Sequence, residues 1–183
     1  MPRLAPVFYQ GDAVVHWSLN IKERQTGWLT EGFDCAFREL MLHTSVREQL
    51  FCPTYCLMPD HMHIVWMGLK AESDQLRGMA FFRTYLSKKL APFTLQHQGY
   101  DHVLGDQERR RNSFATHCAY VLNNPVRAQL VEDAKEWRFA GAIVPGYPNF
   151  NPRADDFWET FWKLYANQCD ANAKRALPRR SSS

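Results

Sequence analysis

Apolar and polar residues alternate along residues 14–22, and this period of two predicts a β-strand. Short runs of β-forming residues predict three more strands, at residues 52–58, 61–67 and 100–104. Pro59 and Asp60 stand between the second and third strands, and this pair is typical of a tight turn. The second and third strands are therefore expected to form an antiparallel hairpin.

In two longer segments the apolar residues recur every three or four positions, which is the spacing of a helix that packs on one side. The first helix is expected at residues 29–48, with Thr30 as its N-cap. The second is expected at residues 73–90, and Pro92 ends it. Both helices should lie against the predicted sheet.

The second half of the chain predicts two more helices and a loop. One helix is expected at residues 106–123, capped by Asp106 and ended by Pro125. A closing helix, rich in tryptophan and phenylalanine, is expected at residues 155–167. Residues 141–152 contain three prolines and two glycines and are predicted to form a loop.

The order of these elements is β-α-β-β-α-β, followed by helices. This order predicts an α+β protein with a ferredoxin-like, split βαβ arrangement: an antiparallel sheet, flanking helices and a C-terminal helix. Residues 1–172 are expected to form one domain, and residues 173–183 a basic, flexible tail. A fold of this kind hosts many functions, so a function has to be argued from particular residues.

Composition narrows the class of protein. Of the 183 residues, 45% are hydrophobic and 22% charged, which excludes wholesale disorder. No apolar run approaches the roughly 20 residues that span a bilayer, and the first ten residues do not resemble a secretory signal. Five scattered cysteines favour reduced thiols. We therefore expect a cytoplasmic protein that does not enter a membrane.

His61 and His63 are the first candidates for chemistry. Side chains alternate along a strand, so the two imidazoles share one face, about 6–7 Å apart along the strand, and can converge on one cation. Met62 between them would point into the core. The alternative is a chance triplet in a chain that contains seven histidines.

Tyr120 is the second candidate, because the predicted helix winds it away from the apolar face. Ser113, His117 and Asn124 share its polar face, and Asn124 lies one turn after it. The alternative is a half-buried tyrosine whose hydroxyl contacts water.

The two signals together describe a phosphoryl-transfer site. A phenol is a poor nucleophile at neutral pH, and a divalent cation can offset charge that develops at phosphorus. Two histidines and one side-chain oxygen would supply part of an octahedral shell suited to Mg²⁺ or Mn²⁺. Attack by Tyr120 would leave a covalent phosphotyrosine and a free 3′-hydroxyl.

Basic residues give a weaker signal for nucleic-acid binding. Arg77, Arg83 and Lys88 on the second helix are candidate phosphate contacts, and Arg83 falls within the apolar stripe of that helix. Three further arginines, at residues 109–111, lead into the tyrosine helix. The alternative is an ordinary solvated surface.

Two motifs give the chain a resemblance to a known family. Pro59-Asp-His-Met-His63 resembles the MP(N/D)HxH signature of the REP-associated tyrosine transposases, single-tyrosine members of the HUH superfamily. The segment at residues 120–128, YVLNNPVRA, is similar to the family's Y-I-x-x-N-P-V-(K/R)-A stretch. The segment at residues 99–104 resembles the DH-containing part of the family between them.

The resemblance implies a role for each matching residue. His61 and His63 would bind Mg²⁺ or Mn²⁺, Tyr120 would become linked to a 5′-phosphate, and Asn124 would be a further metal ligand. Arg83 matches a position that is usually lysine in the family. The implied enzyme is a transposase that cuts and rejoins single-stranded DNA at a hairpin-forming repeat, associated with the bacterial nucleoid, as a monomer or homodimer.

Two other readings remain open at this point. The first is a domesticated protein that binds hairpin nucleic acid without cutting it. The second is a structural zinc site made by Cys52, Cys56, His61 and His63, because the even spacing of the cysteines allows them to share one face of a strand.

Overall fold

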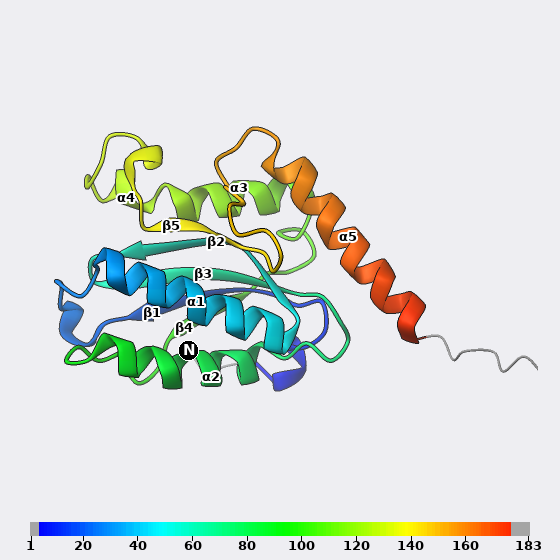
Figure 1. Ribbon diagram of the computed structural model, residues 1–183, viewed down its shortest axis with the longest axis horizontal. Coiled ribbons are helices and arrows are strands. Elements are labelled where there is room, and N and C mark those ends of the chain that lie inside the picture. Colours follow the sequence, from blue (N-terminus) through cyan, green and yellow to red (C-terminus); the bar gives the residue numbers. More distant parts are fainter. Residues whose placement is uncertain (1–3, 177–183) are drawn as a thin grey trace, which may run out of the picture.

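The predicted strands form one antiparallel sheet in the computed structural model, which describes residues 4–176 (Figure 1). The sheet has five strands in the order β4-β1-β3-β2-β5, and every neighbouring pair is antiparallel. Their bounds are β1 Val14–Asn20, β2 Leu50–Met58, β3 His61–Gly68, β4 Tyr100–Val103 and β5 Ala140–Ile143. The first four strands have the expected ferredoxin-like order, and the expected hairpin is β2–β3.

Helices cover both faces of this sheet (Figure 1). Helices α1 (Glu31–Glu48) and α2 (Gln75–Leu90) lie on one face, while α3 (Arg111–Leu122) and the start of α5 (Phe157–Ala176) lie on the other. The remaining elements are the short helix α4 (Asn124–Arg127) and the 3-10 turns η1 (Pro6–Tyr9), η2 (Lys22–Arg24) and η3 (Ala134–Glu136). Thr30 caps α1 as expected, because its hydroxyl accepts a hydrogen bond from the backbone N–H of Phe33.

The prediction of a loop at residues 141–152 is wrong for its first residues. Ala140–Ile143 is the edge strand β5, which pairs with β2 through Cys52, Tyr55 and Cys56. Because the segment AGAI has no alternation and is followed by proline and glycine, its sequence resembles a loop, and only the partner strand makes it a strand.

Helix ends also differ from the expectation. Helix α3 begins at Arg111 rather than at Asp106, because residues 106–109 form a turn in which Arg109 binds Asp12. Helix α5 continues to Ala176, so it includes the first residues of the segment expected as a tail. The rest of that segment lies outside the described residues.

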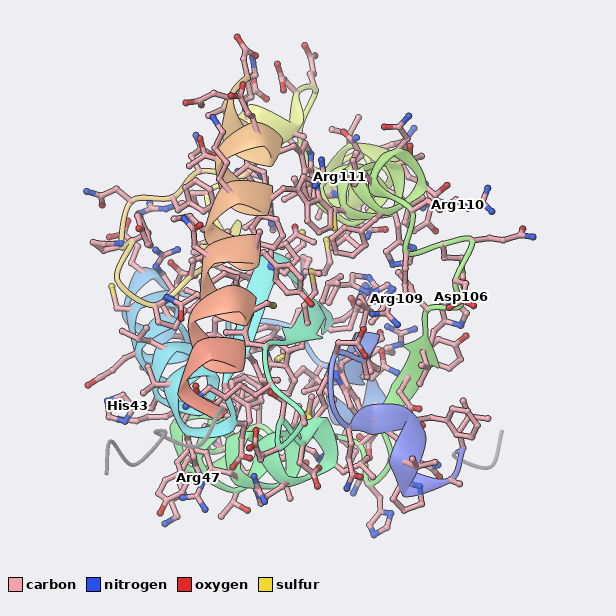
Figure 2. The ribbon with its side chains drawn as sticks, turned by 90° about the vertical axis from the view of Figure 1, so that its right-hand side faces the viewer. His43, Arg47, Asp106, Arg109, Arg110 and Arg111 are labelled. Carbon is pink, nitrogen blue, oxygen red and sulfur yellow. The ribbon has the colours of Figure 1, made fainter. Side chains whose placement is uncertain are left out.

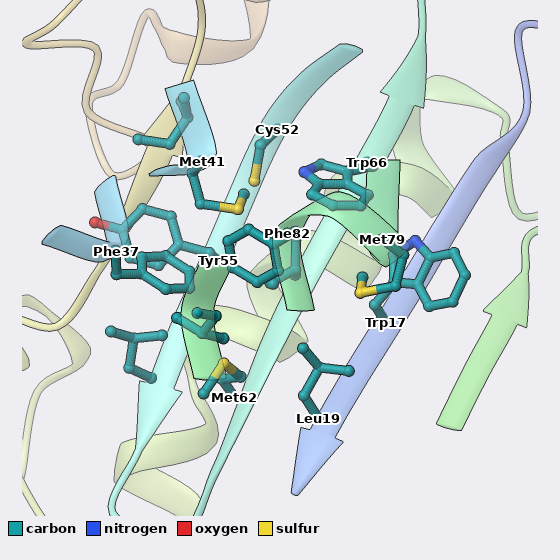
Figure 3. Packing of buried hydrophobic residues seen from close by; sticks show 14 of the residues in the cluster. Trp17, Leu19, Phe37, Met41, Cys52, Tyr55, Met62, Trp66, Met79 and Phe82 are labelled. Carbon is teal, nitrogen blue, oxygen red and sulfur yellow. The ribbon is translucent and has the colours of Figure 1, made fainter. Parts of the chain in front are cut away.

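The alternating side chains of the strands fill two cores, one on each face of the sheet. Met62, Ile64 and Trp66 of β3 point into the core beneath α1 and α2, where each is fully buried (Figure 3). Val65 and Met67 point the other way, into the core that α3 and α5 cover. His61 and His63 share this second face, at the start of β3.

Two further features of the structure concern membrane-spanning helices and thiols. Among residues 4–176, no helix is both long enough and apolar enough to cross a membrane. All five cysteines have free thiols, as the scattered spacing predicted.

Candidate active site

The two histidines of β3 converge at one point. The Nε2 atoms of His61 and His63 lie 3.0 Å apart, and both rings stand on the α3 face of the sheet. His61 is also held from behind, since its Nδ1 lies 2.6 Å from a carboxylate oxygen of Asp60. The Asp60 carboxylate accepts the Nδ1 proton, so the Nε2 lone pair of His61 points toward His63.

This geometry fits two ligands of one cation. Two nitrogens about 2.1 Å from an ion, at a right angle to each other, would lie about 3.0 Å apart. In the described part of the chain, no group of three or more His, Cys, Asp or Glu side chains could hold a metal ion. The histidine pair is therefore an incomplete shell that would need an amide oxygen, water or a substrate phosphate to complete it.

A third histidine, His16 of β1, contacts the pair through His63. Its Nε2 is 3.0 Å from Nδ1 of His63, and its Nδ1 is 3.1 Å from Nε2 of His117 on α3. Sequence reasoning missed His16. The signal was present, because His16, Ser18 and Asn20 are the polar positions of the alternating strand β1.

Burial keeps these inner imidazoles neutral. The pKa of His16 is lowered to about 3, first by burial and then by His63 and His117. The pKa of His63 is lowered to about 4, again mainly by burial and then by His61. Burial also lowers the pKa of His117. A neutral imidazole keeps a lone pair for a metal or a hydrogen bond.

His102 of β4 belongs to the segment that resembles the DH motif, and it borders the same cluster. It pairs with His16 across the β1–β4 ladder, and its Nε2 lies 2.8 Å from the carboxylate of Glu108. This contact holds the pKa of Glu108 below its usual range. Glu108 was not among the residues that the sequence singled out.

Tyr120 lies on the last turns of α3, outside the hydrophobic core. Its side chain is 49% exposed, so the phenol is not buried in the interior. The guanidinium of Arg127, from α4, lies 4.2 Å from the centre of the Tyr120 ring. Asn124 is half-buried, and its amide N–H₂ donates to the carbonyl of Val121, which leaves the amide oxygen as its acceptor.

The direction of α3 indicates toward which end of the sheet Tyr120 lies, relative to the His61–His63 pair. Before α3 begins, Arg109 binds Asp12, just ahead of β1, and His117 in the middle of the helix contacts His16. Helix α3 thus runs from the start of β1 toward its end, where Asn20 pairs with His61. Since Tyr120 follows His117 by about one turn on the same face, it lies toward the His61 end of the sheet.

The three basic residues of α2 lie on the other face of the sheet. Arg77 binds the carboxylate of the buried Glu48, and Arg83 donates to the carbonyls of Gln96 and His97. The ammonium group of Lys88 lies 4.9 Å from the centre of the Tyr85 ring. The structure therefore does not bring these residues together with the histidines, and their role as DNA contacts stays a prediction.

Three arginines lie on the tyrosine side instead. Figure 2 shows Arg109, Arg110 and Arg111 where the chain enters α3, far from Arg47 on α1. Arg109 is paired with Asp12, and the guanidinium of Arg111 lies over the ring of Trp162.

The zinc alternative is wrong because Cys52 and Cys56 do not share a face. The register of β2 shifts between Phe51 and Thr54, so Cys52 points toward α1 and Cys56 toward α3. Burial raises the pKa of both thiols, that of Cys56 to about 12. The raised pKa values disfavour the thiolate form of Cys52 and Cys56, which is the form that binds zinc.

Known proteins include chains similar to this one in sequence and in structure. No family model matches this chain. A protein of Haemophilus influenzae named as a REP-associated tyrosine transposase is 21% identical over 139 residues, which are 68% of this chain and 76% of that protein. A solved structure of a REP-associated tyrosine transposase bound to a REP hairpin matches with a TM-score of 0.64 and 18% identity, over 76% of this chain and 82% of that chain.

The structural match confirms the fold, and the curated relative carries the family name that the two motifs suggested. The sequence motifs, the relative and the shared fold thus agree, and the resemblance of this chain to the REP-associated tyrosine transposases is confirmed.

Proposed function

We propose that this protein is a metal-dependent endonuclease and strand transferase that acts on single-stranded DNA beside a hairpin-forming, REP-like repeat. The observation that carries the proposal is the convergence of the His61 and His63 Nε2 atoms at 3.0 Å, with the helix that bears Tyr120 attached to the same cluster. The REP hairpin in the similar solved structure supports the substrate class.

In the proposed reaction the phenolic oxygen of Tyr120 attacks a backbone phosphorus. A bond forms between this oxygen and phosphorus, and the bond from phosphorus to the 3′-oxygen of the preceding nucleotide breaks. The phenol proton leaves to solvent, and the departing 3′-oxygen takes up a proton. The products are a 5′-phosphotyrosine and a free 3′-hydroxyl, and attack by another 3′-hydroxyl reverses the step and rejoins DNA.

His61, His63 and Asn124 would hold Mg²⁺ or Mn²⁺, which would polarise the phosphate and offset its developing charge. Asp60 orients His61, and His16 lies against the second nitrogen of His63. Arg127 brings a positive charge next to the Tyr120 ring, where it favours the approach of a phosphate.

The test is formation of a covalent protein–DNA adduct. The protein is incubated with Mn²⁺ and a pool of oligonucleotides that carry hairpins with single-stranded flanks, and adducts are resolved on a denaturing gel. Tyr120→Phe should abolish the adduct while hairpin binding continues. Tyr147→Phe removes another exposed tyrosine and should leave the adduct unchanged.

The non-catalytic reading is the other outcome of the same experiment. A wild-type protein that binds hairpins but forms no adduct with any oligonucleotide, at any Mn²⁺ concentration, would contradict the enzyme and support a binding protein.

A further inference from the structure

Four imidazoles form a continuous row from the candidate metal ligands to the tyrosine helix. The row starts with the His61–His63 contact of 3.0 Å, continues from His63 to His16 at 3.0 Å, and ends from His16 to His117 at 3.1 Å. It joins β3, β1 and α3, and its two ends come from parts of the chain that are far apart in sequence.

Only one placement of the ring protons along this row leaves the Nε2 lone pairs of both His61 and His63 free to bind a cation. A neutral imidazole carries one N–H and one lone pair. If Nε2 of His63 keeps its lone pair for a cation, its proton is on Nδ1 and is donated to Nε2 of His16. The proton of His16 is then on Nδ1 and is donated to Nε2 of His117. His61 has the same tautomer, because its Nδ1–H is donated to Asp60.

The reverse arrangement does not prepare a metal site. If His117 donated to His16, then His16 would donate to Nδ1 of His63, and the proton of His63 would stand on Nε2 between the two ligands. A proton in that position blocks the cation. The hydrogen-bond direction that His117 and His16 adopt therefore decides whether His63 can act as a ligand.

We propose that His16 and His117 are positioning residues that couple the metal site to the tyrosine helix. His16 holds His63 in the tautomer and orientation that bind a cation, and His117 makes the docking of α3 part of the same hydrogen-bond chain. A cation at the pair therefore stabilises the docked α3, and the docked α3 strengthens binding of the cation by the same factor. This inference rests on the proposed metal-dependent function.

The first test measures Mn²⁺ affinity of the full chain without DNA, by the loss of the free Mn²⁺ signal in electron paramagnetic resonance. His16→Leu should weaken binding by about 10- to 100-fold, the usual effect of removing the partner of a ligating histidine. His117→Leu should weaken it by about fivefold or more. His117→Gln should restore most of the affinity, because the amide oxygen can accept the His16 proton where Nε2 does.

The second test measures hydrogen exchange of the α3 backbone amides, at residues 111–122, with and without Mn²⁺. Mn²⁺ should slow exchange of α3 in the wild type and in His117→Gln, and should have no such effect in His117→Leu. His43→Leu removes an exposed histidine from α1, on the other face of the sheet, and should behave like the wild type in both tests.

The possible failures point to different conclusions. If His117→Leu binds Mn²⁺ as tightly as the wild type and α3 still responds, the coupling is overturned and the proposed function stands. This holds even if His16→Leu is weak or misfolded, because the half-buried His117 is tested separately. A wild-type chain that binds no Mn²⁺ would overturn both this inference and the metal-dependent function.

Discussion

At the scale of single residues, burial decides the charge of the histidines around the candidate site. His16 is 8% exposed, and its pKa falls to about 3 chiefly because the interior disfavours the charged ring. His63 follows the same rule with a pKa of about 4. Both rings stay neutral in the folded protein at pH values where an unfolded chain would protonate them, so folding is linked to pH.

This linkage predicts a loss of stability in mild acid. Below a pH of about 6.5 the unfolded chain takes up protons that folded His16 and His63 exclude, so the free energy of unfolding falls as the pH drops toward 4. Each excluded proton contributes a slope of roughly 1.4 kcal/mol per pH unit. Urea unfolding from pH 8 to pH 4, with a chelator present, measures the slope.

His16→Phe serves as the comparison for this prediction. Between pH 6 and pH 4 it should reduce the slope of the free energy of unfolding against pH by the contribution of about one proton, roughly 1.4 kcal/mol per pH unit. Above pH 7 the variant and the wild type should both show little dependence on pH. An unchanged slope in the variant would mean that His16 takes up its proton in the folded state.

At the scale of elements, the packing of the sheet depends on how closely the strand ends approach the segments around them. Gly68 ends β3, and its backbone N–H donates to the carbonyl of Ala13. A Cβ atom at Gly68 would lie 1.8 Å from the backbone oxygen of Gly11. Backbone cannot move aside as a flexible side chain does, so only glycine fits where β3 passes this turn.

A pair of glycine substitutions tests this close approach. Gly68→Ala should lower the free energy of unfolding by about 3 kcal/mol or more, because the methyl group overlaps backbone. Gly32→Ala in α1 adds the same methyl group where nothing lies within 4 Å, and should stabilise by a few tenths to about 1 kcal/mol. Thermal unfolding of both variants gives the comparison, and equal effects would contradict the packing argument.

At the scale of the whole molecule, positive charge is divided between the two faces of the sheet. The side with α3 carries the arginines at residues 109–111, at the end of α3 opposite to Tyr120, and Arg110 and Arg111 are exposed. The side with α2 carries Lys88 and Lys89, also exposed. A DNA strand that reaches Tyr120 would approach on the α3 side, so the arginines share its face of the sheet and Lys88 and Lys89 do not.

The salt dependence of hairpin binding distinguishes the two faces. The double variant Arg110→Ala/Arg111→Ala should weaken binding and reduce the slope of log affinity against log salt by about one to two, close to one for each lost phosphate contact. Lys88→Ala/Lys89→Ala removes the same charge from α2 and should change the slope by less. Fluorescence anisotropy at several salt concentrations measures both.

A larger change in the salt slope for the α2 variant than for the arginine variant would have the opposite meaning. If the α2 variant lost more of the slope than the arginine variant, the expectation from the sequence that α2 contacts DNA would be supported, and the path proposed for the strand along α3 would be contradicted.

The sequence alone determined the features that depend on local periodicity. The alternation in residues 14–22 and the β-forming run at residues 61–67 predicted two strands, and the period of a strand put His61 and His63 on one face, opposite Met62. The helical spacing placed Tyr120 off the apolar stripe, and the structure finds it exposed. These predictions held because the period of a strand or helix decides which side chains share a face.

Only the tertiary structure decided the features that depend on a partner distant in sequence. Strand β5 exists because β2 offers it an edge, and the bulge in β2 separates Cys52 from Cys56. His16 meets His117 only after β1, β3 and α3 have packed together, although they lie 101 residues apart in sequence. Periodicity assigns a residue to a face, but the register of strands and the docking of helices decide which faces meet.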